Sequence, residues 1–339
     1  MQNNVTLITG ASGEVGHGLI KHLCDSVDTP IVTFDIQPLS EELSGYCHQA
    51  ITGDILDKSL VGGLSEEYQI DTIYHLASVL STSAEKKPEM AHRVNVEGTL
   101  NLLELAIAQF QQHGTSIKFM YPSSIAVYGL PDIPTKTKAG AISEDEFCIP
   151  TTMYGCNKLY SEHLGRYYTE HYRQLTSDPG SSGIDFRGLR YPGLISADTV
   201  PTGGTSDYGP EMLHYAAQGK HYDCFVRPDA QLPFMAMPDA ILALTLLHDA
   251  PRNSLSRHVY NVTSFSLTAA GILEQVQKIF PDATVDYNPD IKRQGIVDSW
   301  PADLDDSAAR QDWAWSPEFD VERAFSEYLM PAISKRYAE

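Results

Sequence analysis

Tyr154 and Lys158 stand four positions apart in the stretch Tyr154-Gly155-Cys156-Asn157-Lys158. On a helix this spacing puts the phenol and the amine on one face. A free tyrosine titrates near pH 10, so it becomes a usable base only where a nearby cation stabilises its phenolate. Lys158 can supply that cation, and the pair therefore predicts proton abstraction from a substrate hydroxyl. Taken alone, the same spacing is common on exposed helices, so other residues must support this interpretation.

A glycine-rich turn supplies the first support. Gly10, Gly13 and Gly16 follow the apolar run Val5–Thr9 and open a stretch of helical period that starts at Glu14-Val15. Without side chains in the way, backbone N–H groups at such a helix N-terminus can face a pyrophosphate. The spacing Gly-x-x-Gly-x-x-Gly also fits a plain tight turn between a strand and a helix, so the residues that follow decide between the two readings.

The next apolar run, Ile31–Phe34, ends at Asp35 and is followed by Ile36. A carboxylate at this strand end can accept hydrogen bonds from the ribose hydroxyls of adenosine and would repel a 2'-phosphate. Asp35 could instead only cap a turn. The glycine turn and the acidic residue come in the order expected of a dinucleotide site, which favours NAD over NADP.

These residues need a parallel sheet to position them. Short β-branched runs alternate with stretches of helical period, a pattern that predicts an α/β, Rossmann-type, doubly wound parallel sheet. The expected strands are Val5–Thr9, Ile31–Phe34, Thr72–Leu76, Lys118–Tyr121 and Ile184–Leu189, and the expected helices include Glu14–Leu23, Val94–Gln111 and Met153–Tyr172. After Pro192 the alternation fades into shorter elements. We therefore expect an NAD-binding domain over 1–191, to which later segments return, and a smaller, mainly substrate-binding lobe over 192–339.

Composition narrows the class of partner. The chain has 339 residues, 42% of them hydrophobic, and a formal net charge of -20, which would repel nucleic acid. No apolar run reaches the roughly 18 residues that span a bilayer, and a strand pattern stands where a signal peptide would begin, so we expect a cytoplasmic protein without a membrane partner. The five cysteines form no C-x-x-C pair, and we expect neither disulfides nor a metal site.

Ser123-Ser124 comes at the end of the run that begins near Lys118, at the sheet edge where open parallel sheets bind ligands. With the glycine turn before it and Tyr154 and Lys158 after it, the chain resembles the extended short-chain dehydrogenase/reductase family over nearly its whole length. The resemblance implies that Ser124 is the catalytic hydroxyl beside Tyr154 and Lys158, with Ser123 as a second donor to the substrate. It also implies a homodimer that associates through the helices after Leu100 and Met153.

The same resemblance implies a set of cofactor contacts. Asp54 would meet the adenine, Leu76 and Ala77 would line the cofactor, and Asn95 matches a helix-kink position. The full set that we expect to bind NAD is Gly10, Gly13, Glu14, Val15, Gly16, Asp35, Ile36, Asp54, Ile55, Leu76, Ala77, Asn95, Tyr154, Lys158, Tyr191 and Pro192. His75, just before Leu76, is more typical of a satisfied structural histidine than of an acid or base.

Two further segments, 190–208 and 298–307, resemble the members of this family that oxidise L-threonine. The resemblance implies that the substrate is held by Ser81, Ser123, Ser124, Tyr154, Gly193, Thr205 and Ser206. Tyr154 would then act as general base, Lys158 would lower its pKa, Ser124 would orient the hydroxyl, and the product would be 2-amino-3-oxobutyrate. The chain departs from the pattern at Thr202, where glycine is usual, and at Ser206, where threonine is usual. Trp300 is expected to pack within the lobe.

Two other functions stay open. A nucleotide-sugar epimerase or dehydratase of the same family would keep NAD bound and show no net cofactor reduction. A non-catalytic NAD sensor would have no need of Ser124, Tyr154 and Lys158 together. Release of reduced cofactor with L-threonine separates the dehydrogenase from both.

Overall fold

The computed structural model describes residues 4–26, 29–177, 180–201 and 203–338. Its largest sheet has seven strands, in the spatial order β11-β7-β5-β4-β1-β2-β3. Their bounds are Val259–Asn261 for β11, Ile184–Tyr191 for β7, Ile117–Ser124 for β5, Gln69–His75 for β4, Asn4–Thr9 for β1, Ile31–Asp35 for β2 and Gln49–Thr52 for β3. The pairs β1–β2, β1–β4, β2–β3 and β4–β5 are parallel. The predicted α/β class and Rossmann-type sheet are confirmed.

The strand order reverses at β1, because the chain runs from β1 to β2 on one side and later returns to β4 on the other. Right-handed crossovers therefore put helix α1 (Glu14–Ser26) and helix α3 (Lys58–Glu67) on opposite faces of the sheet. Such a reversal leaves a crevice at the carboxyl ends of β1 and β4, which is where doubly wound sheets bind dinucleotides. The Gly10 turn and residues Leu76-Ala77 follow these two strands directly.

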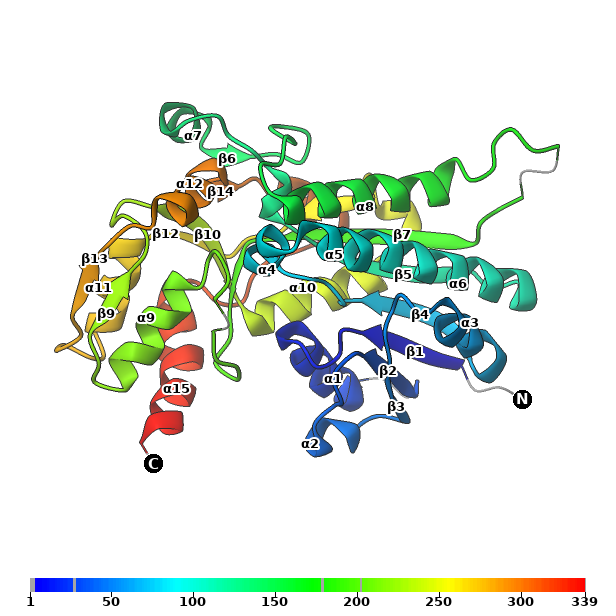
Figure 1. Ribbon diagram of the computed structural model, residues 1–339, viewed down its shortest axis with the longest axis horizontal. Coiled ribbons are helices and arrows are strands. Elements are labelled where there is room, and N and C mark those ends of the chain that lie inside the picture. The colour runs from blue at the N-terminus through cyan, green and yellow to red at the C-terminus, as the bar shows by residue number, and fades with distance from the viewer. Residues whose placement is uncertain (1–3, 27–28, 178–179, 202, 339) are drawn as a thin grey trace. The chain divides into compact units, whose positions relative to one another are not determined.

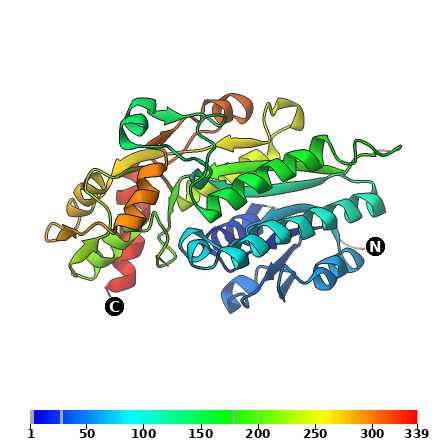
Figure 2. The same ribbon diagram turned by 45° about the horizontal axis from the view of Figure 1, so that its top comes forward.

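Helices α6 (Gly98–His113) and α8 (Met153–Glu170) lie side by side in both views of the ribbon (Figures 1 and 2). Leu102, Leu103 and Leu105 of α6 belong to a buried apolar cluster that also holds Phe119 and Phe186 of the sheet. Leu164 and Tyr168 of α8 pack against the same cluster. This packing fixes α8, and with it Lys158, against the sheet. A π-helical turn, Arg93–Glu97, precedes α6 within the single helix expected over Val94–Gln111.

The chain divides into two compact units. The first consists of Met1–Ser123, Cys156–Leu189 and Leu244–Val259, and the second of Ser124–Gly155, Arg190–Ala243 and Tyr260–Glu339. The first unit holds the glycine turn, Asp35 and Lys158. The second holds Ser124, Tyr154 and the segment around Thr205, although Tyr154 shares helix α8 with Lys158.

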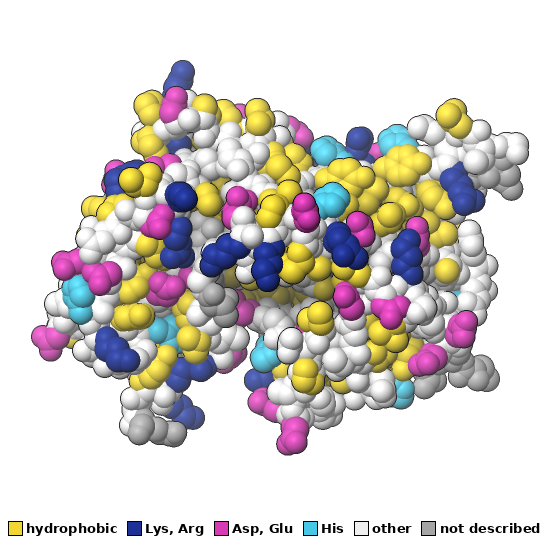
Figure 3. Space-filling view, viewed as in Figure 1, with side chains coloured by type: hydrophobic (Ala, Val, Ile, Leu, Met, Phe, Trp, Pro, Cys, Tyr) yellow, Lys and Arg dark blue, Asp and Glu magenta, His cyan; other side chains and the backbone are white. Residues whose placement is uncertain are grey.

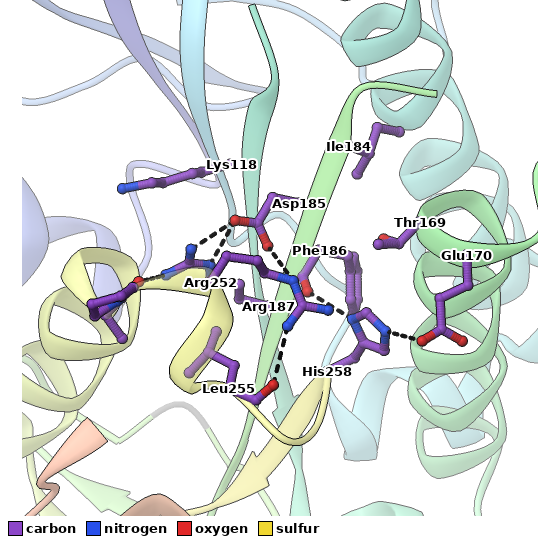
Figure 4. Close-up of polar contacts among 12 residues, drawn as sticks. Lys118, Thr169, Glu170, Ile184, Asp185, Phe186, Arg187, Arg252, Leu255 and His258 are labelled. Carbon is purple, nitrogen blue, oxygen red and sulfur yellow. Dashed lines mark hydrogen bonds and ion pairs between the residues drawn. The ribbon is translucent and has the colours of Figure 1, made fainter. Parts of the chain in front are cut away.

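The segment Leu244–Val259 belongs to the first unit, and a buried arginine binds it to the sheet. Figure 4 shows Arg187 of β7 beside Asp185. Arg187 donates from Nη1 to the carbonyl oxygens of Leu247, His248 and Ala250, at 2.6, 2.9 and 2.7 Å. These carbonyls end helix α10 (Met237–Asp249), where a cation is favoured by the helix dipole. Asp185 accepts from Arg187 Nη2 at 2.6 Å, so the buried guanidinium is paired.

The second unit is built from small sheets with short helices around them. Its strands form a three-stranded sheet, β12-β10-β8, and two pairs, β13-β9 and β14-β6. These strands are β6 Ala141–Ile142, β8 Gly193–Ile195, β9 Tyr222–Cys224, β10 Gln231–Ala236, β12 Phe265–Thr268, β13 Val285–Tyr287 and β14 Asp303–Leu304. Its helices include α7 Ile133–Ala139, α9 Tyr208–Ala217, α11 Ala269–Gln277, α12 Ile291–Ser299, α13 Ser307–Trp313, α14 Val321–Arg323 and α15 Met330–Tyr337.

The helices of the first unit not yet named are α2 Glu41–Ser44, α4 Ser81–Lys86 and α5 Pro88–His92. Within the described residues, no helix is both long enough and apolar enough to cross a membrane.

Candidate active site

The glycine turn has the shape that the sequence predicted for it. Gly10 has a φ of +69°, in the left-handed region that favours glycine, and a Cβ there would lie 2.4 Å from the backbone nitrogen of Ala77. A Cβ on Gly16 would lie 2.4 Å from the carbonyl oxygen of Ala11. Gly13 is exposed at the tip of the turn, just before α1 begins at Glu14. Packing therefore requires glycine at both ends of the turn. The N-terminus of α1, which follows the turn directly, is the kind of element that binds a pyrophosphate.

Asp35 is half-buried at the carboxyl end of β2, and it also holds the glycine turn. Its Oδ2 accepts from the backbone N–H of Ser12 at 2.9 Å, and its Oδ1 accepts from the N–H of Gln37 at 2.8 Å. Each carboxylate oxygen keeps a further lone pair. Asp35 can thus fix the turn and still accept from a ribose hydroxyl, so its turn-capping and cofactor roles are compatible.

The loop after β4 is anchored by Asn95. This buried side chain accepts from the N–H of Val79 at 2.7 Å and donates to the carbonyl of Val79 at 3.0 Å. Asn95 lies in the π-helical turn before α6, which agrees with the helix-kink position implied for it. Its polar atoms thus hold the loop that carries Leu76 and Ala77, and Ser81 is buried at the start of α4 beyond that loop.

Asp54, the expected adenine contact, and Ile55 follow β3, whereas Ile36 follows β2. Asp54 is exposed and accepts from the N–H of Leu56 at 2.9 Å, and Ile36 is also exposed. Ile55 is buried, and a Cβ on Gly98 would lie 2.8 Å from its Cγ2. Ile55 therefore packs on the helix behind the loop, whereas Asp54 and Ile36 face outward.

Lys158 is almost completely buried, with 4% of its surface exposed. Its Nζ donates to the carbonyl oxygen of Pro122 at 2.7 Å and lies 4.6 Å from the centre of the Tyr121 ring. Burial lowers the pKa of Lys158 to about 7, and the charge of Glu162 opposes that shift. The amine is thus held at the end of β5 by its contact with Pro122, in surroundings where burial favours loss of its proton and Glu162 favours its retention.

Tyr154 is the second residue of α8 and lies one helical turn before Lys158, with its side chain half-buried. The local geometry expected from the sequence is therefore present: a helix carries both side chains at a spacing of one turn.

The two serines after Lys118 differ in what they bind. Ser124 caps the short 3-10 helix Ile125–Val127, and its Oγ accepts from the N–H of Ala126 at 3.2 Å. Its hydroxyl hydrogen can still donate. Ser123 is buried and donates to Oε1 of Glu162 at 2.5 Å. The hydroxyl hydrogen of Ser123 is thus committed to a carboxylate of the protein, which weakens its predicted role as a donor to substrate.

His75 is a structural residue, as its position suggested. Its Nδ1 lies 2.9 Å from Thr9 Oγ1 and its Nε2 lies 2.9 Å from Thr99 Oγ1. Burial, with a smaller contribution from the charge of Lys158, lowers the pKa of His75 to about 3. The ring is therefore neutral and spans β1 and α6.

In the second unit, Tyr191, Pro192 and Gly193 are buried at the junction of β7 and β8. The hydroxyl of Tyr191 donates to the carbonyl of Ala240 at 2.5 Å. A Cβ on Gly193 would lie 2.8 Å from the Phe234 ring and 3.3 Å from Cβ of Ser206. Gly193 and Ser206, two of the expected substrate residues, are thus neighbours.

The loop that carries Thr205 and Ser206 is held from two sides. Asp207 Oδ2 accepts from the N–H groups of Gly203 and Gly204, at 2.9 and 2.6 Å. Arg293 of α12 donates from Nη2 to the carbonyl of Gly204 at 2.7 Å. The N–H groups of Gly203 and Gly204 and the carbonyl of Gly204 are therefore all hydrogen-bonded. Thr205 is buried and Ser206 half-buried, whereas Thr202 lies outside the described residues.

Comparison with known proteins places this geometry in a family. The sequence model of the NAD dependent epimerase/dehydratase family matches residues 6–263. The chain belongs to this family. It is 36% identical over 320 residues to the mitochondrial L-threonine 3-dehydrogenase of Bos taurus, covering 93% of this chain and 79% of the relative.

Two solved structures are similar over nearly the whole chain. The L-threonine dehydrogenase from Clostridium difficile has a TM-score of 0.87 at 31% identity, covering 100% of both chains. A monomeric L-threonine 3-dehydrogenase from a metagenome database has a TM-score of 0.85 at 35% identity, covering 98% of this chain and 100% of the other.

Sequence reasoning missed three residues of this epimerase/dehydratase chain. Glu162 stands four residues after Lys158, the same spacing that drew attention to Tyr154, so helical periodicity alone could have found it. Asp207 binds Gly203 and Gly204 within four positions, so a local turn pattern could have found it, whereas Arg293 of α12 reaches the carbonyl of Gly204 across 89 positions. No local pattern reveals the contact of Arg293. Trp300 is buried, in line with the packing role expected of it.

The structure also groups three potential metal ligands that the sequence did not suggest. His221, Asp223 and Asp286 are exposed on the β9–β13 pair, and one ligand atom of each lies within 4.8 Å of the others. His221 Nε2 is 3.4 Å from a carboxylate oxygen of Asp286, which an ordinary surface ion pair explains.

Proposed function

We propose that this epimerase/dehydratase family member is an NAD-dependent L-threonine 3-dehydrogenase, which oxidises the 3-hydroxyl of L-threonine to give 2-amino-3-oxobutyrate. The observation that carries the chemistry is the buried ammonium of Lys158 on the same helix face as Tyr154, at the carboxyl end of β5. The choice of substrate rests on those relatives that are named threonine dehydrogenases, which match nearly the full length of the chain.

The residues of the first unit fit NAD. Gly10 and Gly16 close the turn so tightly that side chains are excluded, the N-terminus of α1 offers its amides to a pyrophosphate, and Asp35 offers a carboxylate to the ribose. NAD, when bound, accepts the two electrons and the hydrogen that leave C3 of the substrate. The protein itself supplies placement and proton transfer.

Tyr154 is the general base in this proposal. Its phenolate oxygen takes the proton of the 3-hydroxyl, because the ammonium of Lys158 favours the ionised phenol. Ser124 donates its hydroxyl hydrogen to the substrate oxygen and so orients the bond that is broken. Ser81, Gly193, Thr205 and Ser206 hold the amino acid, with Asp207 and Arg293 fixing the loop of the last two. Ser123 acts through Glu162 instead of touching the substrate.

A substrate panel tests the proposal. Purified protein is incubated with NAD and, separately, L-threonine, L-allo-threonine, L-serine and UDP-galactose, and reduced cofactor is measured by absorbance. We expect reduced cofactor with L-threonine and much slower formation with L-serine. Conversion of UDP-galactose without net reduction would instead support an epimerase, the second function that the family description keeps open. Failure with every amino acid would contradict the proposal.

Asp35 should set the cofactor preference. Replacing it with Ser removes the charge that repels a 2'-phosphate, so the ratio of kcat/KM for NADP to that for NAD should rise about tenfold or more. Affinity for NAD should also fall, because the Ser12 amide loses its acceptor. Initial rates with both cofactors measure the ratio. Glu67→Gln, an exposed change at the end of α3, is the control, and an unchanged ratio in Asp35→Ser would remove the role.

A homodimer is part of the proposal. Hydrophobic side chains gather over α6 and α8 on the face shown in Figure 3. On α8, Tyr160 and Tyr167 are 54% and 40% exposed. If a second copy covers this patch, Tyr167→Glu should weaken association strongly and Tyr167→Phe should not. Sedimentation equilibrium tests both variants, and a monomeric wild-type protein, like the relative named monomeric, would contradict the homodimer. The cytoplasmic location and the absence of a nucleic-acid partner stay predictions from the sequence.

A further inference from the structure

Glu162 is a buried carboxylate that holds Ser123 and has no stated role toward Lys158 in the proposed reaction. It lies on α8 one helical turn after Lys158, and only 4% of its surface is exposed. A buried carboxylate is costly unless it is paired or hydrogen-bonded. The hydroxyl of Ser123 donates to its Oε1 at 2.5 Å, and the neighbouring cation is Lys158.

Consecutive residues of β5 hold these two groups of α8. The carbonyl of Pro122 accepts from Lys158 Nζ at 2.7 Å, and the next residue, Ser123, donates to Glu162. The strand end thus offers an acceptor to the cation and a donor to the anion. Because the two contacts are adjacent on the strand and one turn apart on the helix, the position of each side chain is set from both elements.

Among the groups described around Lys158, Glu162 is the one whose negative charge stabilises the ammonium. His75 on β4 is neutral, because burial lowers its pKa to about 3, and Tyr121 on β5 presents its ring to the ammonium. Tyr154 lies one turn earlier on α8 itself. Burial lowers the pKa of Lys158 to about 7, and among these groups Glu162 is the one that opposes the shift.

We propose that Glu162 is a positioning residue for proton transfer. Its carboxylate, held by the hydrogen bond from Ser123, keeps the Lys158 side chain protonated and in place at the end of β5. The inference rests on the proposed function, because it assumes that Lys158 must be charged to favour the phenolate of Tyr154. It does not require Glu162 to touch either the substrate or the cofactor.

The test removes the charge of Glu162 but keeps its shape. In Glu162→Gln the Lys158 ammonium should lose its proton at a pH lower by about one unit or more, measured by NMR of isotopically labelled lysine side chains. The alkaline limb of kcat should move in the same direction, while the Kd for NAD changes little. Glu170→Gln is the matched control, because Glu170 lies on the same helix with its side chain exposed.

Two further variants separate charge from packing. Glu162→Asp keeps the charge and should restore most of the wild-type titration. Ser123→Ala removes the hydrogen bond to the Glu162 carboxylate and should move the titration of Lys158 in the same direction as Glu162→Gln, by a smaller amount. This variant tests the inference if Glu162→Gln does not fold. An unchanged titration of Lys158 in the folded variants would overturn the inference. Full turnover in Tyr154→Phe would instead overturn the proposed function, and the NMR titration would still report on Glu162.

Discussion

Replacing Tyr154 with Phe is expected to lower kcat by about 10²–10⁴-fold, the usual contribution of a positioned general base. The hydroxyl that would take the substrate proton is removed, while the ring and its place on α8 remain. Binding of NAD should be nearly unchanged, because the glycine turn and Asp35 belong to other elements. Steady-state rates with L-threonine and NAD, together with a titration of NAD binding, measure both effects.

Tyr160→Phe is the control for this prediction. Tyr160 lies on the same helix, is exposed, and loses only its hydroxyl in the variant. The turnover of the Tyr160→Phe variant should match that of the wild type. Near-normal activity in Tyr154→Phe would remove Tyr154 as the base, and an equal loss in both variants would point to damage of helix α8.

Gly10→Ala should weaken binding of NAD by tenfold or more and also destabilise the fold. The new Cβ would lie 2.4 Å from the backbone nitrogen of Ala77, and the φ of +69° strains any L side chain. Backbone strain of this kind costs about 1–3 kcal/mol before the clash is counted. The turn must therefore shift away from β4, and the amides at the start of α1 shift with it. Thermal unfolding and NAD titration are the measurements.

Gly62→Ala provides the matched control in the same unit. Gly62 lies within α3, and a Cβ there meets nothing within 4 Å. Alanine is a better helix former than glycine by about 1 kcal/mol, so this variant should be as stable as the wild type or more so. Equal NAD affinity in Gly10→Ala and Gly62→Ala would contradict the role given to the glycine turn.

The elements near the cofactor could be predicted from the sequence because local chemistry determines them. The turn at Gly10 and the helix that follows it come from glycine spacing and apolar period, and the structure has β1 at Asn4–Thr9 and α1 from Glu14. Strand β3 escaped prediction, because it lies at the sheet edge with mostly exposed residues and so lacks a buried apolar run. The short strands of the second unit escaped for a similar reason, since two or three residues carry no detectable period.

The candidate site was predictable in type and less so in contacts. The spacing of Tyr154 and Lys158 follows from helical geometry, and the structure retains it. That Ser123 binds Glu162 was not predictable, because strand and helix meet across 39 positions and either serine could have faced the helix. The contact of Arg293 with the loop at Thr205 likewise depends on tertiary packing. Single-sequence patterns predict which groups can react, and packing decides which partners hold them.

The most direct test of the account uses L-threonine that carries deuterium at C3. The protein is incubated with this substrate and NAD, and the reduced cofactor is analysed by mass spectrometry. We expect one deuterium in each reduced nicotinamide, formed together with an equal amount of 2-amino-3-oxobutyrate. Reduced cofactor without deuterium, or no reduced cofactor at all, would contradict the oxidation of the 3-hydroxyl of L-threonine by this protein.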